Sequence, residues 1–109
     1  MGKPVAGEVV VIPFPQTDLA LGKRRPALVL VDLPGDDLIL CQITSRPRSD
    51  GLSVPLDMAD FERGQLHRES FIRPHRLFTV ETAVILYSVG KVRSSKLGEV
   101  LAKARKLFS

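Results

Sequence analysis

The sequence is poor in the residues that build disulfides and metal sites. Its 109 residues include one cysteine, Cys41, and two histidines, His67 and His75. A single cysteine cannot form a disulfide within the chain, which favours a cytoplasmic setting. Cys41 also lies in a predicted buried strand, far in sequence from both histidines, so no metal-ligand motif is present. We therefore expect neither a metal nor another cofactor.

Long apolar runs and targeting segments are missing as well. No stretch approaches the roughly 18 apolar residues that span a bilayer, and the first eight residues have no signal-peptide core. A glycine-rich phosphate loop is also absent. The sequence thus predicts a cytoplasmic protein with no membrane partner.

Positive charge is what the sequence has in excess. It holds 16 Lys and Arg against 12 Asp and Glu, a net charge of +4. This excess suits a polyanion or an acidic protein partner. The length predicts a single domain over residues 1–109, and the hydrophobic content of 44% is enough for one modest core. A core of that size leaves little spare stability, so a partner subunit would help.

Short β-branched and apolar runs predict a mainly β fold with a helix at its end. Apolar residues recur from Leu97 to Phe108 with helical spacing, and Ser94 or Ser95 is expected to cap that helix. We expect a small, strongly curved antiparallel sheet or partial barrel, plugged by the helix. Strands are expected at residues 7–13, 25–32, 38–44 and 52–56, with a turn at 34–37. Residues 60–64 are expected to form a turn or helical piece, and residues 82–87 a strand or short helix. Pro74 predicts that the strand at residues 70–78 is at an edge or bent.

Arginines gather at the ends of two predicted strands. If the turn at residues 34–37 closes a hairpin, Arg25 and Thr44 lie at similar distances from it and become neighbours. An arginine fork beside a hydroxyl can bind a phosphate. The alternative is a solvated strand end with a hydroxyl in a turn, and the spacing alone leaves both open.

Several segments together resemble the MazF/PemK family of bacterial toxins. They occur in the family's order, and PFPQTDLALGKRRPALVL is similar to a PemK-like branch in particular. The segments are GEVV at residues 7–10, RPALV at 25–29, ITS at 43–45, VPL at 54–56, then Ser70, Leu77, Thr79 and the terminal helix.

The resemblance implies an SH3-like antiparallel barrel that pairs as a two-fold homodimer. It implies a sequence-selective endoribonuclease that cleaves single-stranded RNA, including mRNA, without a metal, and that a cognate acidic antitoxin neutralises. The arginine before the proline and the threonine of the IT segment would be catalytic, which assigns Arg25 and Thr44. Arg25 would stabilise the charge that develops when the 2′-hydroxyl attacks the phosphorus.

The sequence also offers candidates for the proton acceptor and for the RNA contacts. His75 has a suitable ordinary pKa, although strand alternation turns it away from the face of Arg76. Asp18 could orient Arg25 or contact RNA. The residues expected to bind RNA are Lys23, Arg24, Ser45, Arg46, Arg48, Arg73 and Arg76.

Two other functions remain open at this point. The family often has Gln-Ile-Arg-Thr where this chain has Arg76-Leu77-Phe78-Thr79, which is compatible with a non-catalytic, RNA-binding relative. The same fold also serves CcdB-like toxins that bind DNA gyrase. The RRP and ITS segments argue against that group, because binding gyrase requires no arginine–threonine phosphate site.

Overall fold

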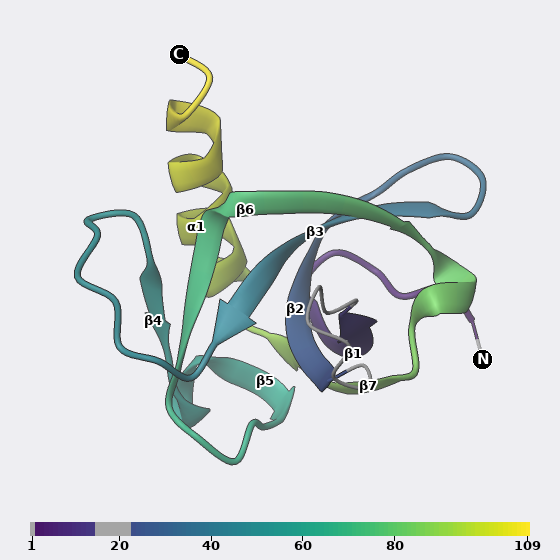
Figure 1. Ribbon diagram of the computed structural model, residues 1–109, viewed down its shortest axis with the longest axis horizontal. Coiled ribbons are helices and arrows are strands. Elements are labelled where there is room, and N and C mark those ends of the chain that lie inside the picture. The colour runs from purple at the N-terminus through teal and green to yellow at the C-terminus, as the bar shows by residue number, and fades with distance from the viewer. Residues whose placement is uncertain (1, 15–22) are drawn as a thin grey trace.

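The computed structural model describes residues 2–14 and 23–109. Within them the chain forms one curled, seven-stranded antiparallel sheet, a half-barrel with a helix at its C-terminal end (Figure 1). The strand order across the sheet is β4-β6-β3-β2-β1-β7-β5. The elements are β1 (Glu8–Phe14), β2 (Lys23–Asp32), β3 (Asp37–Thr44), β4 (Val54–Leu56), η1 (Met58–Asp60), β5 (Phe61–Gly64), β6 (Ser70–Glu81), η2 (Thr82–Val84), β7 (Tyr87–Val92) and α1 (Ser94–Lys106).

Both faces of the curled sheet are buried, which explains the nearly continuous apolar runs in its central strands. Along β3, Cys41 and Ile43 join a cluster on one face, and α1 covers it with the fully buried Val100. Leu38 and Leu40 point to the opposite face and pack beneath Phe78 and other residues of the curl. Figure 1 shows β6 arching across the molecule beside α1 and turning through η2 toward β7.

The predicted hairpin of β2 and β3 is confirmed. Ala27 lies opposite Gln42, and Leu28 lies opposite Cys41. Gly35 supplies the positive φ of 76° that the turn requires. Strands β1 and β4 also fall within a residue or two of their expected ranges.

The prediction of a turn or helical piece over residues 60–64 is wrong for most of its length. The helical turn η1 ends at Asp60 and has Asp57 as its N-cap, and residues 61–64 form β5 against β7. Only Phe61 of β5 is buried, so no alternating pattern marked the strand. Residues 82–84 form η2 and Tyr87 is the first residue of β7, a strand that the local sequence pattern does not predict.

The edge position proposed for the strand around Pro74 is also wrong, although the bend is present. Strand β6 lies between β4 and β3 and runs on to Glu81. Leu77 pairs with Cys41 of β3, and Arg73 pairs with the next residue of β3, Gln42. Residues 74–76 between them therefore bulge out of the ladder. The bulge accommodates Pro74, which has no N–H to donate.

Helix α1 begins at Ser94, and neither Ser94 nor Ser95 is its N-cap. That position belongs to Arg93, whose side chain makes no capping bond. Arg93 is held instead by η1: its backbone N–H donates to Asp60 O at 2.8 Å and its Nε donates to Ala59 O at 2.9 Å. In the described part of the chain, no helix is long and apolar enough to cross a membrane.

Candidate functional site

The ends of β2 and β3 bring Arg25 and Thr44 to one pocket of about 300 Å³. Each lies two residues beyond the Ala27–Gln42 pair, on the side away from the turn. Antiparallel pairing therefore carries the two side chains to the same end of the hairpin. We call this the Arg25 pocket.

The Arg25 pocket is cationic and rich in hydroxyl groups. Arg24, Arg25 and Arg68 line it, together with His67. Its hydroxyl groups come from Thr44, Ser45 and Ser70. No carboxylate of the described residues lines the pocket. Such a pocket attracts an anion, and a guanidinium beside a hydroxyl suits a phosphate group.

Thr44 is fixed in place while its hydroxyl proton stays available. The side chain is 6% exposed, and its Oγ1 accepts a hydrogen bond from the backbone N–H of Arg46 at 3.2 Å. Within the described residues, that hydroxyl donates to no acceptor, and the side chain of half-buried Arg25 makes no hydrogen bond or ion pair. Both groups therefore retain donors for a ligand.

The opposite wall of the Arg25 pocket comes from the start of β6. Phe71 lies opposite Thr44 in the β3–β6 ladder, which brings the preceding residue, Ser70, to the pocket. Ser70 is buried, and its Oγ donates to the backbone carbonyl of Arg68 at 3.0 Å. This bond ties the backbone of Arg68 to the start of β6.

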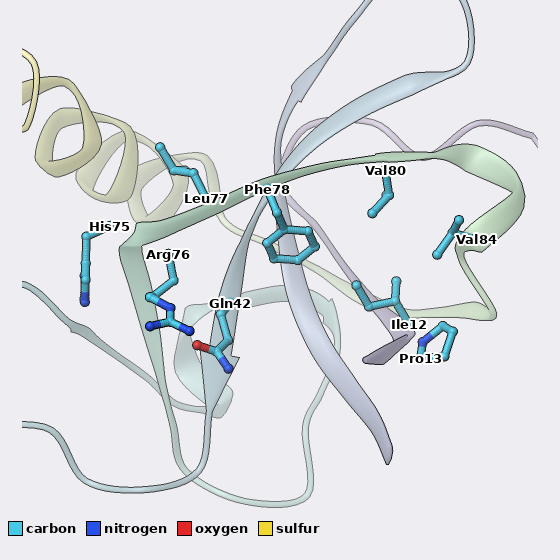
Figure 2. A pocket seen from close by; sticks show the side chains of 9 residues that line it. All are labelled: Ile12, Pro13, Gln42, His75, Arg76, Leu77, Phe78, Val80 and Val84. Carbon is cyan, nitrogen blue, oxygen red and sulfur yellow. The ribbon is translucent and has the colours of Figure 1, made fainter. Parts of the chain in front are cut away.

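A second, larger pocket of about 530 Å³ lies in the curl of the sheet. We call it the apolar pocket. Figure 2 shows its apolar end, where Ile12, Pro13, Val80 and Val84 gather to the right of Phe78. Its polar end is formed by Gln42, His75 and Arg76.

A polar cluster joins β6 to the loop that follows β3. Arg73 Nη2 lies 3.1 Å from His75 Nε2, and Arg73 Nη1 donates to Gln42 Oε1 at 3.4 Å. A guanidinium only donates, so His75 Nε2 accepts and the imidazole is neutral. Asp50 Oδ2 lies 3.8 Å from both Arg73 Nη2 and His75 Nε2.

Two pKa values in this cluster are shifted. Burial lowers the pKa of His75 below 6.5, and the charge of Arg73 lowers it further, which agrees with the neutral ring. Backbone hydrogen bonds from Ser53 and Leu52 lower the pKa of Asp50 to about 2. Asp50 is therefore a stable anion at neutral pH.

The residues predicted from sequence divide between these sites. Arg24, Arg25, Thr44 and Ser45 line the Arg25 pocket, and Arg76 lines the apolar pocket. Lys23, Arg46 and Arg48 are exposed nearby along the chain, at the start of β2 and in the loop after β3. Arg73 and His75 belong to the polar cluster with Asp50 and Gln42. Asp18 lies outside the described residues.

Sequence reasoning did not assign His67, Arg68 and Ser70 to the Arg25 pocket. Residues 65–69 have no periodic pattern and form no helix or strand. The signal that identifies them is the pairing of β6 with β3, which aligns the start of one strand with the end of the other. That register depends on the bulge at residues 74–76, which the sequence does not locate.

Comparisons with known proteins agree with this fold. Residues 6–108 match the family described as PemK-like, MazF-like toxin of type II toxin-antitoxin system. A chain of the MazE–MazF complex (Form-II) from Deinococcus radiodurans has a TM-score of 0.79 at 23% identity, covering 99% of this chain and 97% of that one. The toxin MazF-mt6 of Mycobacterium tuberculosis has a TM-score of 0.67 at 22% identity, covering 89% and 90%.

A third similar structure combines an enzyme with its antitoxin. It is an endoribonuclease in complex with its cognate antitoxin from Mycobacterial species, with a TM-score of 0.74 at 12% identity over 96% of this chain and 94% of that one. No curated protein matches the sequence. The family match spans nearly the whole chain, and the chain belongs to the PemK-like, MazF-like toxins of type II toxin-antitoxin systems.

Proposed function

We propose that this protein is an endoribonuclease toxin that cleaves single-stranded RNA, including mRNA, at the Arg25 pocket without a metal ion. The observation that carries the proposal is the meeting of Arg25 and Thr44 in one cationic pocket with no described carboxylate. Membership of the PemK-like, MazF-like toxin family supports the same activity.

The proposed reaction is attack by a ribose 2′-hydroxyl on the adjacent phosphorus. The products are a 2′,3′-cyclic phosphate and a 5′-hydroxyl. Arg25 would stabilise the extra negative charge of the transition state with two parallel N–H donors. One donor of this kind is worth about 2.7–4 kcal/mol in well-studied enzymes. Thr44 would donate its free hydroxyl proton to a phosphate oxygen and fix its orientation.

The neighbouring cations are proposed to hold the RNA backbone. Contacts to phosphates give affinity that is largely independent of sequence and falls as salt rises. Arg73 has its guanidinium partly committed to Gln42 and His75, so we assign it a smaller share of this binding. The full set proposed to contact RNA is Lys23, Arg24, Ser45, Arg46, Arg48, Arg73 and Arg76.

We also propose that an acidic antitoxin segment covers the Arg25 pocket and competes with RNA. The similar structures from Deinococcus radiodurans and from Mycobacterial species include toxin–antitoxin complexes, and the net charge of +4 favours an acidic partner. Binding should weaken with added salt, because exposed charges are screened beyond about 8 Å at physiological ionic strength. A complex that bound RNA as well as the free toxin does would refute the competition.

The proposed active form is a homodimer. Equilibrium sedimentation should give about twice the monomer mass of 12.0 kDa. A monomer mass throughout the micromolar range would refute this part of the proposal.

Incubation of the purified protein with a mixed-sequence single-stranded RNA in the presence of EDTA tests the activity. We expect discrete fragments with cyclic phosphate and 5′-hydroxyl ends. The same RNA annealed to its complement is the control and should remain intact, because base pairing hides the bases and fixes the backbone. Single-stranded RNA that is bound yet stays whole would identify a non-catalytic binding protein instead.

A further inference from the structure

We infer that His67 is the general base of the RNA cleavage, the group that accepts the proton of the attacking 2′-hydroxyl. This inference rests on the proposed endoribonuclease function and adds a catalytic residue to it. It starts from the position of His67 in the wall of the Arg25 pocket.

The Arg25 pocket needs a proton acceptor that Arg25 and Thr44 cannot supply. Arginine keeps its proton far above neutral pH, and a threonine hydroxyl is a very weak base. Histidine is the residue type whose ordinary pKa, about 6.5, suits this task near neutrality. His67 is the histidine that lines the same pocket as Arg25 and Thr44.

The segment that carries His67 separates two neighbouring cavities. Leu66, His67 and Arg68 line both the Arg25 pocket and a cavity of about 330 Å³ beside it. His67 is exposed, so an RNA strand that crosses from one cavity to the other can reach its ring. A phosphate held by Arg25 would then place the adjoining ribose next to the imidazole.

The other histidine has no free lone pair for this step. His75 Nε2 accepts from Arg73 at 3.1 Å, so the ring proton lies on Nδ1. That Nδ1 is buried and has no hydrogen-bond partner among the described residues. His75 also lines the apolar pocket and not the Arg25 pocket.

Carboxylates are the remaining candidates among the described residues near His67. Asp57 and Glu69 line the adjacent cavity but not the Arg25 pocket. Asp57 is also committed to η1, where its Oδ1 accepts from Ala59 N at 2.8 Å. The charged groups that line the two cavities around His67 are Arg24, Arg25, Arg68, Asp57 and Glu69.

The step balances without a further reagent. The 2′-oxygen forms a bond to phosphorus while its proton passes to the unprotonated ring nitrogen of His67. The bond from phosphorus to the 5′-oxygen breaks, and the leaving oxygen takes a proton from water. The imidazolium then returns its proton to solvent hydroxide, which regenerates the base.

Single-turnover cleavage in EDTA, measured from about pH 5 to about pH 8.5, tests the inference across the range in which histidine titrates. The parent rate should rise tenfold per pH unit and then level off once the general base is unprotonated. His67→Gln should be slower by about 10²-fold or more, in line with a lost general base, and should lack this inflection. His75→Gln should keep it.

The outcomes separate this inference from the proposed function. Binding of a 2′-O-methylated RNA, which lacks the nucleophile, should change less than about threefold in His67→Gln, because one weak contact is worth little in total affinity. An equal loss of binding and cleavage would make His67 an RNA contact and overturn the inference. If His67→Gln cleaves as fast as the parent, with the same inflection, the inference fails while the function stands. If the parent cleaves no RNA, the function itself fails and the inference with it.

Discussion

Replacing Thr44 with valine changes one hydroxyl group into a methyl group at a nearly fully buried position. The hydroxyl has two assigned partners: it accepts from Arg46 N–H at 3.2 Å, and in the proposed reaction it donates to a phosphate oxygen. The substitution keeps the branched shape of the side chain. It therefore tests the loss of the hydroxyl while the β-branched side chain is retained.

The two losses have different sizes. A net backbone hydrogen bond is worth about 0.5–1.5 kcal/mol, so the free energy of unfolding should fall by about 1 kcal/mol. A hydrogen bond to a charged group is worth about 1.5–3 kcal/mol. At about 1.36 kcal/mol per factor of ten, the cleavage rate should fall by about 10- to 150-fold.

Single-turnover cleavage of single-stranded RNA gives the rate, and urea unfolding gives the stability. Thr44→Ser is the matched control, because it keeps the hydroxyl and should retain most of the rate. A Thr44→Val protein that is folded by circular dichroism and cleaves as fast as the parent would refute the contact between Thr44 and the phosphate.

Three further predictions concern the fold around the site. Gly64→Ala should lower the free energy of unfolding in urea by about 2–5 kcal/mol, because the residue has a φ of 74° and its new Cβ would collide with Val89 O and lie 2.5 Å from Gly90 Cα. Gly35→Ala, with a φ of 76° but open space, should lower it by only about 1–2 kcal/mol. Equal losses in the two variants would contradict the steric argument. Asp50 has its pKa lowered from 3.8 to about 2, so the stability that it contributes is present above pH 3.8 and lost as the pH falls toward 2. Asp50→Asn should remove this pH-dependent part of the stability. If Asp50→Asn unfolds with the same acid profile as the parent, the assignment to Asp50 is refuted. Cys41 is fully buried and burial raises the pKa of its thiol to about 12, so a thiol reagent should modify it only as fast as the protein unfolds, and rapid labelling of the folded protein would contradict this burial.

The parts of the fold that were predictable are those with a strong local pattern. The apolar runs of β2 and β3 and the turn around Gly35 define a hairpin, and the helical spacing from Leu97 onward defines α1. Strand β5 was not predicted, because three of its four residues are exposed and no alternating apolar pattern marks it. It exists through pairing with β7, and a local pattern does not report such a long-range contact.

The candidate site divides in the same way. Arg25 and Thr44 could be paired from sequence, because one hairpin with one turn links them. His67 and Ser70 could not, because their place beside Thr44 depends on how β6 pairs with β3 across the bulge at residues 74–76. The sequence suggested His75 as a proton acceptor because it does not show the folded contact in which His75 Nε2 accepts from Arg73.

The most direct test of the whole account compares Arg25→Lys with Arg24→Lys in single-turnover cleavage of single-stranded RNA in EDTA. Both residues line the pocket, and both substitutions keep the charge while removing the guanidinium fork. Arg25 precedes Pro26, whose ring restricts its backbone to extended conformations and so limits its motion. We predict that Arg25→Lys lowers the rate by about 10²- to 10³-fold, as expected for a lost transition-state donor, while Arg24→Lys changes mainly the salt-dependent affinity. A folded Arg25→Lys protein that cleaves RNA as fast as the parent would contradict the account and leave Arg25 as a solvated strand end.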